Sequence, residues 1–218
     1  MILPEAALLL LLDDETGKPL VESTRVDFAL EAAFVAELIA QGAVKLSGSP
    51  SVLARTSVEP ADPMLKAAVD RVDNCPAGVA MRKIPAGSRW NDTKTYRETL
   101  YERLKEQNAL TENRRKVLKI FTATTYTPGA NDFETPVVEA LRRCLLEGDV
   151  PDERTAALTA TMNTIAVLPK LFPSAKKRVL KIRAEEIRTD ARISPAMSKL
   201  LSELKAAFTS AALGATGA

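Results

Sequence analysis

The sequence predicts a mainly α-helical fold: a single globular helical domain with a buried central helix and two β-hairpins. The chain has 218 residues, of which 46% are apolar and 27% charged, an ordinary balance for a globular protein with one core. Two segments, residues 6–12 and 27–41, are apolar on nearly every side when read as helices, as buried helices are. A helix followed by a hairpin is predicted twice. We place the domain at residues 1–213 and expect residues 214–218 to be a frayed tail.

The first elements are a short buried helix and a longer central one. Pro4 fits the first position of a helix, and the run Ala6–Leu12 then predicts a helix with no polar face. The acidic sequence of residues 13–17 predicts a solvated turn. A second helix is predicted to start at Thr24 and to end before Gly42, which is typical of a helix stop.

A hairpin, a helix and a long loop follow. Residues 43–46 and 52–58 are separated by Ser-Gly-Ser-Pro, which favours a hairpin. Asp62 and Pro63 open an amphipathic helix that extends to about Val72. Residues 74–92 contain two prolines and two glycines, so we expect a mobile loop there.

The second half of the chain is predicted to be helical apart from one hairpin. A helix is expected over residues 93–107. The hairpin then has strands near 109–112 and 116–126, with its turn at Asn113 and Arg114. Four more helices are predicted at residues 134–147, 153–168, 174–187 and 195–213. Ser194 and Pro195 form a favourable start for the last helix.

The composition excludes several kinds of chemistry. The chain has no histidine, which excludes Ser-His-Asp and Cys-His nucleophilic systems and His-ligated metals. Cys75 and Cys144 are too few for an all-cysteine zinc site, and we expect two reduced thiols. We found no phosphate-binding glycine loop and no dinucleotide fingerprint. We therefore expect no metal, no cofactor and no enzymatic activity.

The longest apolar run predicts a protein without a membrane span. Ala6–Leu12 has seven residues, whereas a helix needs about 20 apolar residues to span a bilayer. No basic segment precedes it, as a signal peptide would require. We therefore expect a cytoplasmic protein that is peripheral at the inner face of the membrane.

Positive charge is concentrated in two segments, although the net charge is only +2. Residues 78–120 have eleven basic and five acidic residues, and residues 170–205 have ten basic and four acidic residues. One interpretation is solvated helix faces. The other is a basic surface that attracts a phosphate-bearing partner, either anionic lipid or nucleic acid.

The best candidate site combines arginine, lysine and the only tryptophan. Arg89 and Trp90 are followed by Lys94 and Arg97, which share one face of the predicted helix. Arginine offers a planar fork to phosphate oxygens, and tryptophan suits an interface. The alternative is a tryptophan packed under the loop, with Lys94 and Arg97 paired to Glu98 or Asp92.

Two further basic segments have a functional and a structural interpretation. Arg114, Arg115 and Lys116 at the predicted hairpin turn could touch a bilayer or a DNA groove, or could simply protect an exposed edge. The helix that includes Lys176–Arg183 is either a basic amphipathic surface helix or one that packs its apolar stripe inward.

The order of several short motifs resembles the Golgi phosphoprotein 3 family, in its bacterial branch. The resemblance extends from about Leu3 to Phe208 and rests most on Leu3-Pro4-Glu5-Ala6, Leu8–Leu12 and Asp13-Asp14-Glu15-Thr16-Gly17. Further similar segments are Ala36–Gly42, Asp62-Pro63-Met64-Leu65, Arg103-Leu104 with Ala109-Leu110, and Arg154-Thr155-Ala156-Ala157-Leu158.

This resemblance implies a helical domain with two hairpins and a peripheral membrane protein that binds phosphatidylinositol 4-phosphate. Two positions of the family's lipid pocket correspond to Lys94 and Arg97, whereas a pocket arginine corresponds to Glu31, where Arg25 could supply the missing charge. The implied partners are anionic phospholipid or phosphoinositide head groups and other proteins. The second hairpin is implied in self-association into a homo-oligomer.

Three functional hypotheses remain open from the sequence. The first is a non-enzymatic peripheral membrane or adaptor protein that binds anionic head groups through a basic face including Arg25, Arg89, Trp90, Lys94 and Arg97. The second is a nucleic-acid-binding protein with winged-helix-like units, which is less favoured because the helix before each hairpin lacks a row of base-reading side chains. The third is an enzyme with an unrecognised carboxylate or lysine site.

Overall fold

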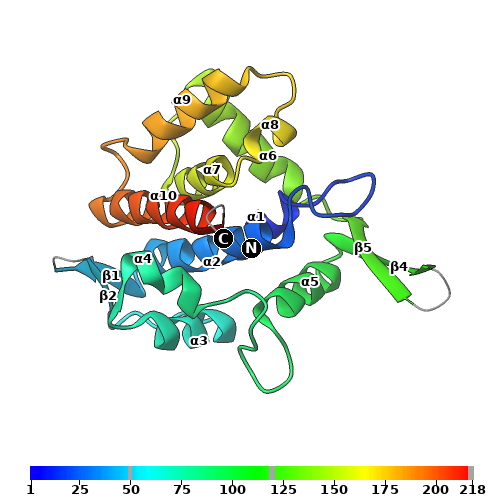
Figure 1. Ribbon diagram of the computed structural model, residues 1–218, viewed down its shortest axis with the longest axis horizontal. Coiled ribbons are helices and arrows are strands. Elements are labelled where there is room, and N and C mark those ends of the chain that lie inside the picture. Colours follow the sequence, from blue (N-terminus) through cyan, green and yellow to red (C-terminus); the bar gives the residue numbers. More distant parts are fainter. Residues whose placement is uncertain (49–50, 118–120, 216–218) are drawn as a thin grey trace.

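The computed structural model describes residues 1–48, 51–117 and 121–215 and has a mainly α-helical architecture, as predicted (Figure 1). In chain order, the α-helices of the described residues are α1 (Leu3–Leu9), α2 (Ser23–Ala40), α3 (Pro63–Val72), α4 (Ala77–Ala80), α5 (Tyr96–Glu106), α6 (Glu134–Arg142), α7 (Glu153–Thr164), α8 (Leu168–Leu171), α9 (Lys177–Arg188) and α10 (Pro195–Ala215). Two short helical turns complete the set, η1 (Met81–Lys83) and the π-helical η2 (Arg143–Glu147).

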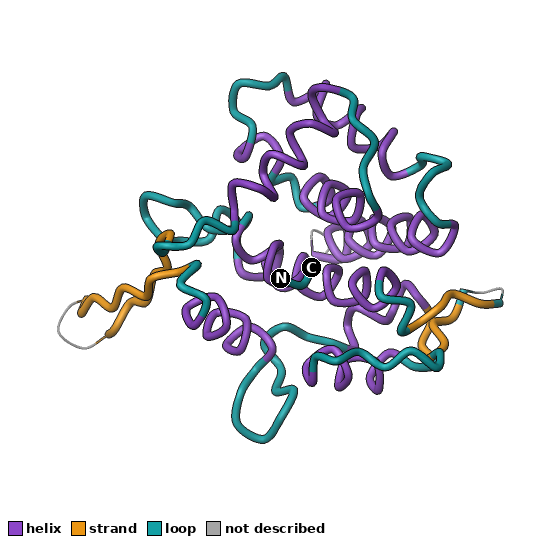
Figure 2. Tube along the Cα trace, turned by 180° about the vertical axis from the view of Figure 1, so that it is seen from behind, coloured by secondary structure: helices purple, strands orange, loops and turns teal. Residues whose placement is uncertain are grey.

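Helix α2 is the central element, because its second half is buried on every side. Its residues from Ala32 to Ile39 are all buried, and so are all residues of α1. Helices α7 and α10 pack on one side of α2, whereas α3 and η1 pack on the other (Figures 1 and 2). The predicted central helix is therefore confirmed, with Ser23 rather than Thr24 as its first residue.

The first hairpin belongs to a three-stranded antiparallel sheet. Strand β1 (Val44–Ser47) pairs with β2 (Val52–Arg55), and β2 pairs with the two-residue strand β3 (Cys75–Pro76). The prediction of one continuous loop over residues 74–92 is wrong, because this segment contains β3, α4 and η1 before its irregular part begins.

The second hairpin is longer than predicted and projects from the helical body (Figures 1 and 2). Strand β4 (Leu110–Val117) pairs with β5 (Phe121–Pro128) over eight residue pairs. The predicted turn at Asn113 and Arg114 is wrong: these residues pair with Thr125 and Thr124. The Asn113 amide instead bonds within the ladder, donating to Thr127 Oγ1 over 2.9 Å. Residues 118–120, which link the strands, lie outside the described residues.

The helices of the second half differ from the prediction in three places. The segment 134–147 divides into α6 and the π-helical turn η2. The helix predicted over residues 153–168 ends at Thr164. Ala166 then has a left-handed φ of 61° before α8 begins. Helix α10 reaches Ala215, two residues beyond the predicted end. Ser194 Oγ accepts a hydrogen bond from Met197 N over 3.2 Å, so the predicted start of this helix is confirmed.

Both cysteines are buried and unpaired. Cys75 lies in β3 and Cys144 in η2.

Across the described residues, every helix is too short or too polar to pass through a bilayer.

Candidate anion-binding site

The loop before α5 is held in one conformation by its own polar groups. Asn91 Oδ1 accepts hydrogen bonds from the backbone N–H groups of Thr93 and Lys94, over 3.0 and 2.8 Å. Thr95 caps α5, and Glu98 completes a capping box by accepting from Thr95 N. Because the sequence supplies these caps, Arg89, Trp90, Lys94 and Arg97 gather at the start of α5, as expected.

Trp90 is half-buried against α5 rather than free to contact a ligand. Its Nε1–H donates to Thr99 Oγ1 over 2.7 Å, and its ring packs against the core. The indole therefore has its only polar group occupied. This arrangement matches the alternative in which the tryptophan packs under the loop.

Two of the four cations of the expected site, Lys94 and Arg97, are already paired with carboxylates. Lys94 Nζ lies 2.6 Å from Glu102 Oε2, and Arg97 forms an ion pair with Asp27 on α2. These partners differ from the predicted ones, Glu98 and Asp92, because Glu98 is used in the cap and the Arg97 side chain crosses to α2. The charges of Lys94 and Arg97 are therefore compensated, whereas Arg89 forms no salt bridge with a described residue.

Glu31 adds a second carboxyl group beside this site. Its Oε1 accepts from the Ala86 N–H over 3.4 Å. Burial raises the pKa of Glu31 to about 7, although the Ala86 N–H and the charge of Arg82 act in the opposite direction. A phosphate at this position would meet Asp27 and Glu31 where the family resemblance implies an arginine.

Arg25 is not brought to the site. At about 100° per residue, Arg25 lies roughly 160° around α2 from Asp27. Its guanidinium bonds to Glu22 over 2.8 Å and to the Ile165 carbonyl over 3.2 Å, beside the ring of Phe208. Arg25 therefore belongs to the α10 side of the molecule and cannot supply the missing pocket charge.

The hairpin arginines are also separate from the start of α5. Arg114 and Arg115 lie in β4, at the other end of α5, whose 11 residues span about 16 Å. As neighbours in a strand they face opposite sides of the ribbon. Arg114 pairs with Glu112, whereas Arg115 is exposed. Lys116 lies opposite Thr122, and its side chain lies outside the described residues.

Arg89, in the loop before α5, is exposed and donates to the Asp92 carbonyl over 3.2 Å.

Acidic and basic residues of the segments that carry the family resemblance form ion pairs with one another inside the fold. Glu37 on α2 is fully buried and accepts from Arg154 Nη2 over 2.5 Å and from Leu3 N over 3.0 Å. Arg103 on α5 contacts both Asp62 and the buried Glu5. These contacts join α1, α2, α5 and α7, so the motif residues have a structural role.

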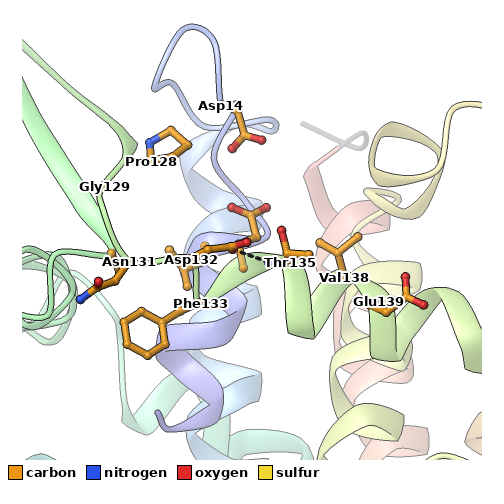
Figure 3. A pocket seen from close by; sticks show the side chains of 12 residues that line it. Asp14, Pro128, Gly129, Asn131, Asp132, Phe133, Thr135, Val138 and Glu139 are labelled. Atoms are coloured by element: carbon orange, nitrogen blue, oxygen red, sulfur yellow. Dashed lines mark hydrogen bonds between the residues drawn. The ribbon is translucent and has the colours of Figure 1, made fainter.

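A cavity that the sequence did not predict lies between the base of the second hairpin and α6 (Figure 3). It has a volume of about 420 Å³, and its acidic lining is Asp14, Asp132, Glu134 and Glu139. Burial raises the pKa of Glu134 to about 7, with a smaller contribution from the charges of Asp14 and Asp132. No sequence signal links residues 14 and 132–139, because only the fold brings the first turn to α6. Among the described residues, no group of three metal-ligating side chains is placed to hold a metal ion.

Helix α2, which precedes the first hairpin, is enclosed by other elements. The winged-helix interpretation needs an exposed recognition helix before the first hairpin, but α2 is buried along most of its length. An enclosed helix cannot enter a groove. The structure therefore excludes α2 as a recognition helix, whereas α5, the helix of the second predicted unit, is buried along one face only.

The fold defines a class: mainly α-helical proteins with an enclosed central helix, a small three-stranded sheet and a projecting hairpin. Comparison with known families gives a match over residues 3–204 to Golgi phosphoprotein 3 (GPP34). The match covers nearly the whole chain, so the chain belongs to this family. A search among curated proteins finds no match.

Proposed function

We propose that the chain is a peripheral membrane protein of the adaptor kind that binds anionic lipid head groups. The observation that carries this proposal is its membership of the Golgi phosphoprotein 3 family over residues 3–204. The proposed role is binding rather than catalysis, at the inner face of a membrane.

The geometry near α5 supports general anion binding over a pocket for one phosphoinositide. Asp27 compensates Arg97, Glu31 occupies the place of an expected arginine, and Arg25 faces away. A specific site needs several donors that converge on one phosphate, whereas attraction to a charged surface needs only exposed cations. We therefore propose that surface charge, and not one phosphoinositide, controls binding.

Co-sedimentation with liposomes tests this function. The vesicles are neutral phosphatidylcholine, phosphatidylcholine with phosphatidylglycerol, and phosphatidylcholine with phosphatidylinositol 4-phosphate at matched charge, each at 50 and 300 mM salt as roughly chosen limits of screening. We expect similar binding to both anionic compositions, weaker at high salt, and little binding to the neutral vesicles.

Two outcomes would contradict the proposal in different ways. Binding only to the phosphoinositide vesicles would mean that a specific pocket exists despite Glu31. Absence of binding to all anionic vesicles would remove the lipid-binding function and direct attention to protein partners.

A further inference from the structure

The strongest uncompensated charge in the described part of the chain lies at the beginning of α9. Between Glu153 and Glu185 the sequence has seven basic residues and no acidic residue. Four of the basic residues are exposed within six positions: Lys176, Lys177, Arg178 and Lys181. None of the four forms a salt bridge with a described residue, so their charge is available to a partner.

The second half of α9 differs, because its charges are neutralised locally. Arg183 pairs with Glu186, Arg188 pairs with Glu185, and Lys205 of α10 also pairs with Glu185. The positive patch is thus limited to the first half of the helix. Its position follows from where the sequence places acidic residues.

Two exposed apolar side chains lie within this patch. Val179 is 43% exposed and Ile182 is 47% exposed, and they are neighbours at i and i+3. The inward face of α9 is formed by other residues, Leu180, Ala184 and Ile187, which are buried. The interpretation in which this helix packs an apolar stripe inward is therefore confirmed, while Val179 and Ile182 remain exposed. We name residues 176–182 the α9 patch.

Single exposed apolar residues need no explanation, and neither does a solvated basic helix face. At about 100° per residue, Arg178, Ile182 and Val179 fall within about 100° of one another around α9. A cation beside exposed apolar side chains on one face is the pattern of an interfacial helix. This combination suits a bilayer with anionic head groups better than nucleic acid, because a phosphate backbone offers no acyl region to Val179 and Ile182.

A cavity beside the α9 patch adds room for a head group. It lies between the turn before α8, α9 and α10 and has a volume of about 350 Å³. Lys177 and Lys181, one helical turn apart, both line it, together with apolar atoms of Leu168, Leu180 and Phe208. Ammonium groups above apolar walls match a phosphate attached to a glycerol and its acyl chains.

The α9 patch and the loop before α5 lie on opposite sides of α2. Helix α9 forms the upper edge of the molecule in Figures 1 and 2, whereas the loop forms the lower edge. A flat bilayer can therefore meet only one of them at a time. On the loop side, Arg82, Lys83 and Arg89 are also exposed and form no salt bridge with a described residue, but the four cations of the α9 patch are more closely spaced along the chain.

We propose that the α9 patch is the face that contacts the bilayer, with Arg178 and Lys181 at lipid phosphates and Val179 and Ile182 at the head-group boundary. This inference rests on the proposed function, that the chain binds anionic membranes. It differs from the site expected at Lys94 and Arg97.

The test compares three variant pairs of the full chain on phosphatidylglycerol vesicles. At about 1 kcal/mol per basic residue near the surface, Arg178→Gln with Lys181→Gln should weaken binding about tenfold or more. Val179→Ser with Ile182→Ser leaves the charge unchanged and should weaken binding about threefold or more. Lys94→Gln with Arg97→Gln should change it less than about twofold, since surface cations in ion pairs contribute little.

A charge-matched control separates the patch from the loss of net charge. Lys66→Gln with Lys199→Gln removes two exposed lysines, each paired with a glutamate, outside the α9 patch. This control should bind as the native chain does. All exchanged residues of α9 are exposed, and thermal unfolding of each variant verifies that the fold is retained.

The outcomes distinguish the two proposals. If the native chain binds and the α9 variants match the control, the α9 inference is overturned while the proposed function stands. A loss confined to Lys94→Gln with Arg97→Gln would likewise overturn the inference and place the contact at α5. If the native chain binds no anionic vesicle, the proposed function fails and the inference fails with it.

Discussion

At the scale of single residues, buried carboxyl groups decide what the candidate site can bind. Glu31 lies where the family resemblance implies an arginine, and Asp27 holds Arg97 from the neighbouring turn of α2. The sequence identified Lys94, Arg97 and Trp90 as neighbours and left open that they were already engaged, but the ion-pair partners that it suggested were wrong. Pairing partners such as Asp27 and Glu102 come from the path of each side chain, which local spacing does not determine.

Glu31 should make the free energy of unfolding depend on pH. Its pKa is raised to about 7 in the folded chain, whereas an unfolded glutamate titrates near 4.3, an approximate reference value. Between these values the folded chain binds more protons, so stability falls as pH rises from about 4.5 to 7. We expect Glu31→Gln to match the native chain at about pH 5 and to exceed it by about 1–3 kcal/mol at about pH 8, measured by urea unfolding.

Glu139→Gln is the matched control for this prediction. Its hydrogen bond with Arg142 holds the pKa of Glu139 below the ordinary value. This control should therefore show no gain at alkaline pH. A stability difference between Glu31→Gln and the native chain that stays constant with pH would contradict the assignment.

At the scale of elements, local signals predicted helices and a turn but not how they dock. The buried central helix and the starts of α3 and α10 follow from apolar periodicity and from caps at Asp62 and Ser194. The position of the second hairpin turn does not, because Asn and Arg in a strand look like turn residues when the partner strand is not considered. The interruption at Ala166, between α7 and α8, was not predicted because residue 166 is neither glycine nor proline.

The second hairpin depends on contacts with the rest of the chain, since an isolated two-stranded hairpin is marginally stable. Tyr126 N–H donates to the Gly17 carbonyl over 2.9 Å, and the rings of Tyr101 and Tyr126 stack with centroids 3.9 Å apart. Gly17 has a φ of +63°, and a Cβ there would lie 2.8 Å from Tyr126 N.

Gly17→Ala should therefore separate the first turn from β5. We expect a loss of about 2 kcal/mol or more in the free energy of unfolding, because strain and a backbone clash act together. Gly87→Ala is the control, since a Cβ at Gly87 would have no neighbour within 4 Å. Equal stability of the two variants would show that the turn moves away from β5 at little cost.

At the scale of the whole molecule, the distribution of charge gives the protein two different sides. Both basic segments were visible in the sequence, but only the three-dimensional fold shows that α2 lies between them and that acidic residues pair with Lys94 and Arg97 of the first. The sequence could not reveal this, because Asp27 is 70 positions from Arg97. The predicted site at α5 stays a prediction, and the α9 patch is its competitor.

The single tryptophan can report which side meets the membrane. Trp90 belongs to the loop before α5, on the side of α2 opposite the α9 patch. With α9 against the bilayer, lipids brominated in their acyl chains should leave the fluorescence of Trp90 unchanged while the protein is fully bound. Strong quenching by these lipids would place the α5 side in the membrane.

The two buried cysteines can report how often the fold opens locally around each of them. Burial raises the pKa values of Cys75 and Cys144, so a thiol reagent reacts with either only when its surroundings open. Cys75 lies on the edge strand β3, and Cys144 lies in the π-helical turn that contacts α9. The labelling rate of each thiol therefore measures local opening in a separate part of the fold, and slower labelling of Cys144 on vesicles would reveal membrane binding as a change in dynamics.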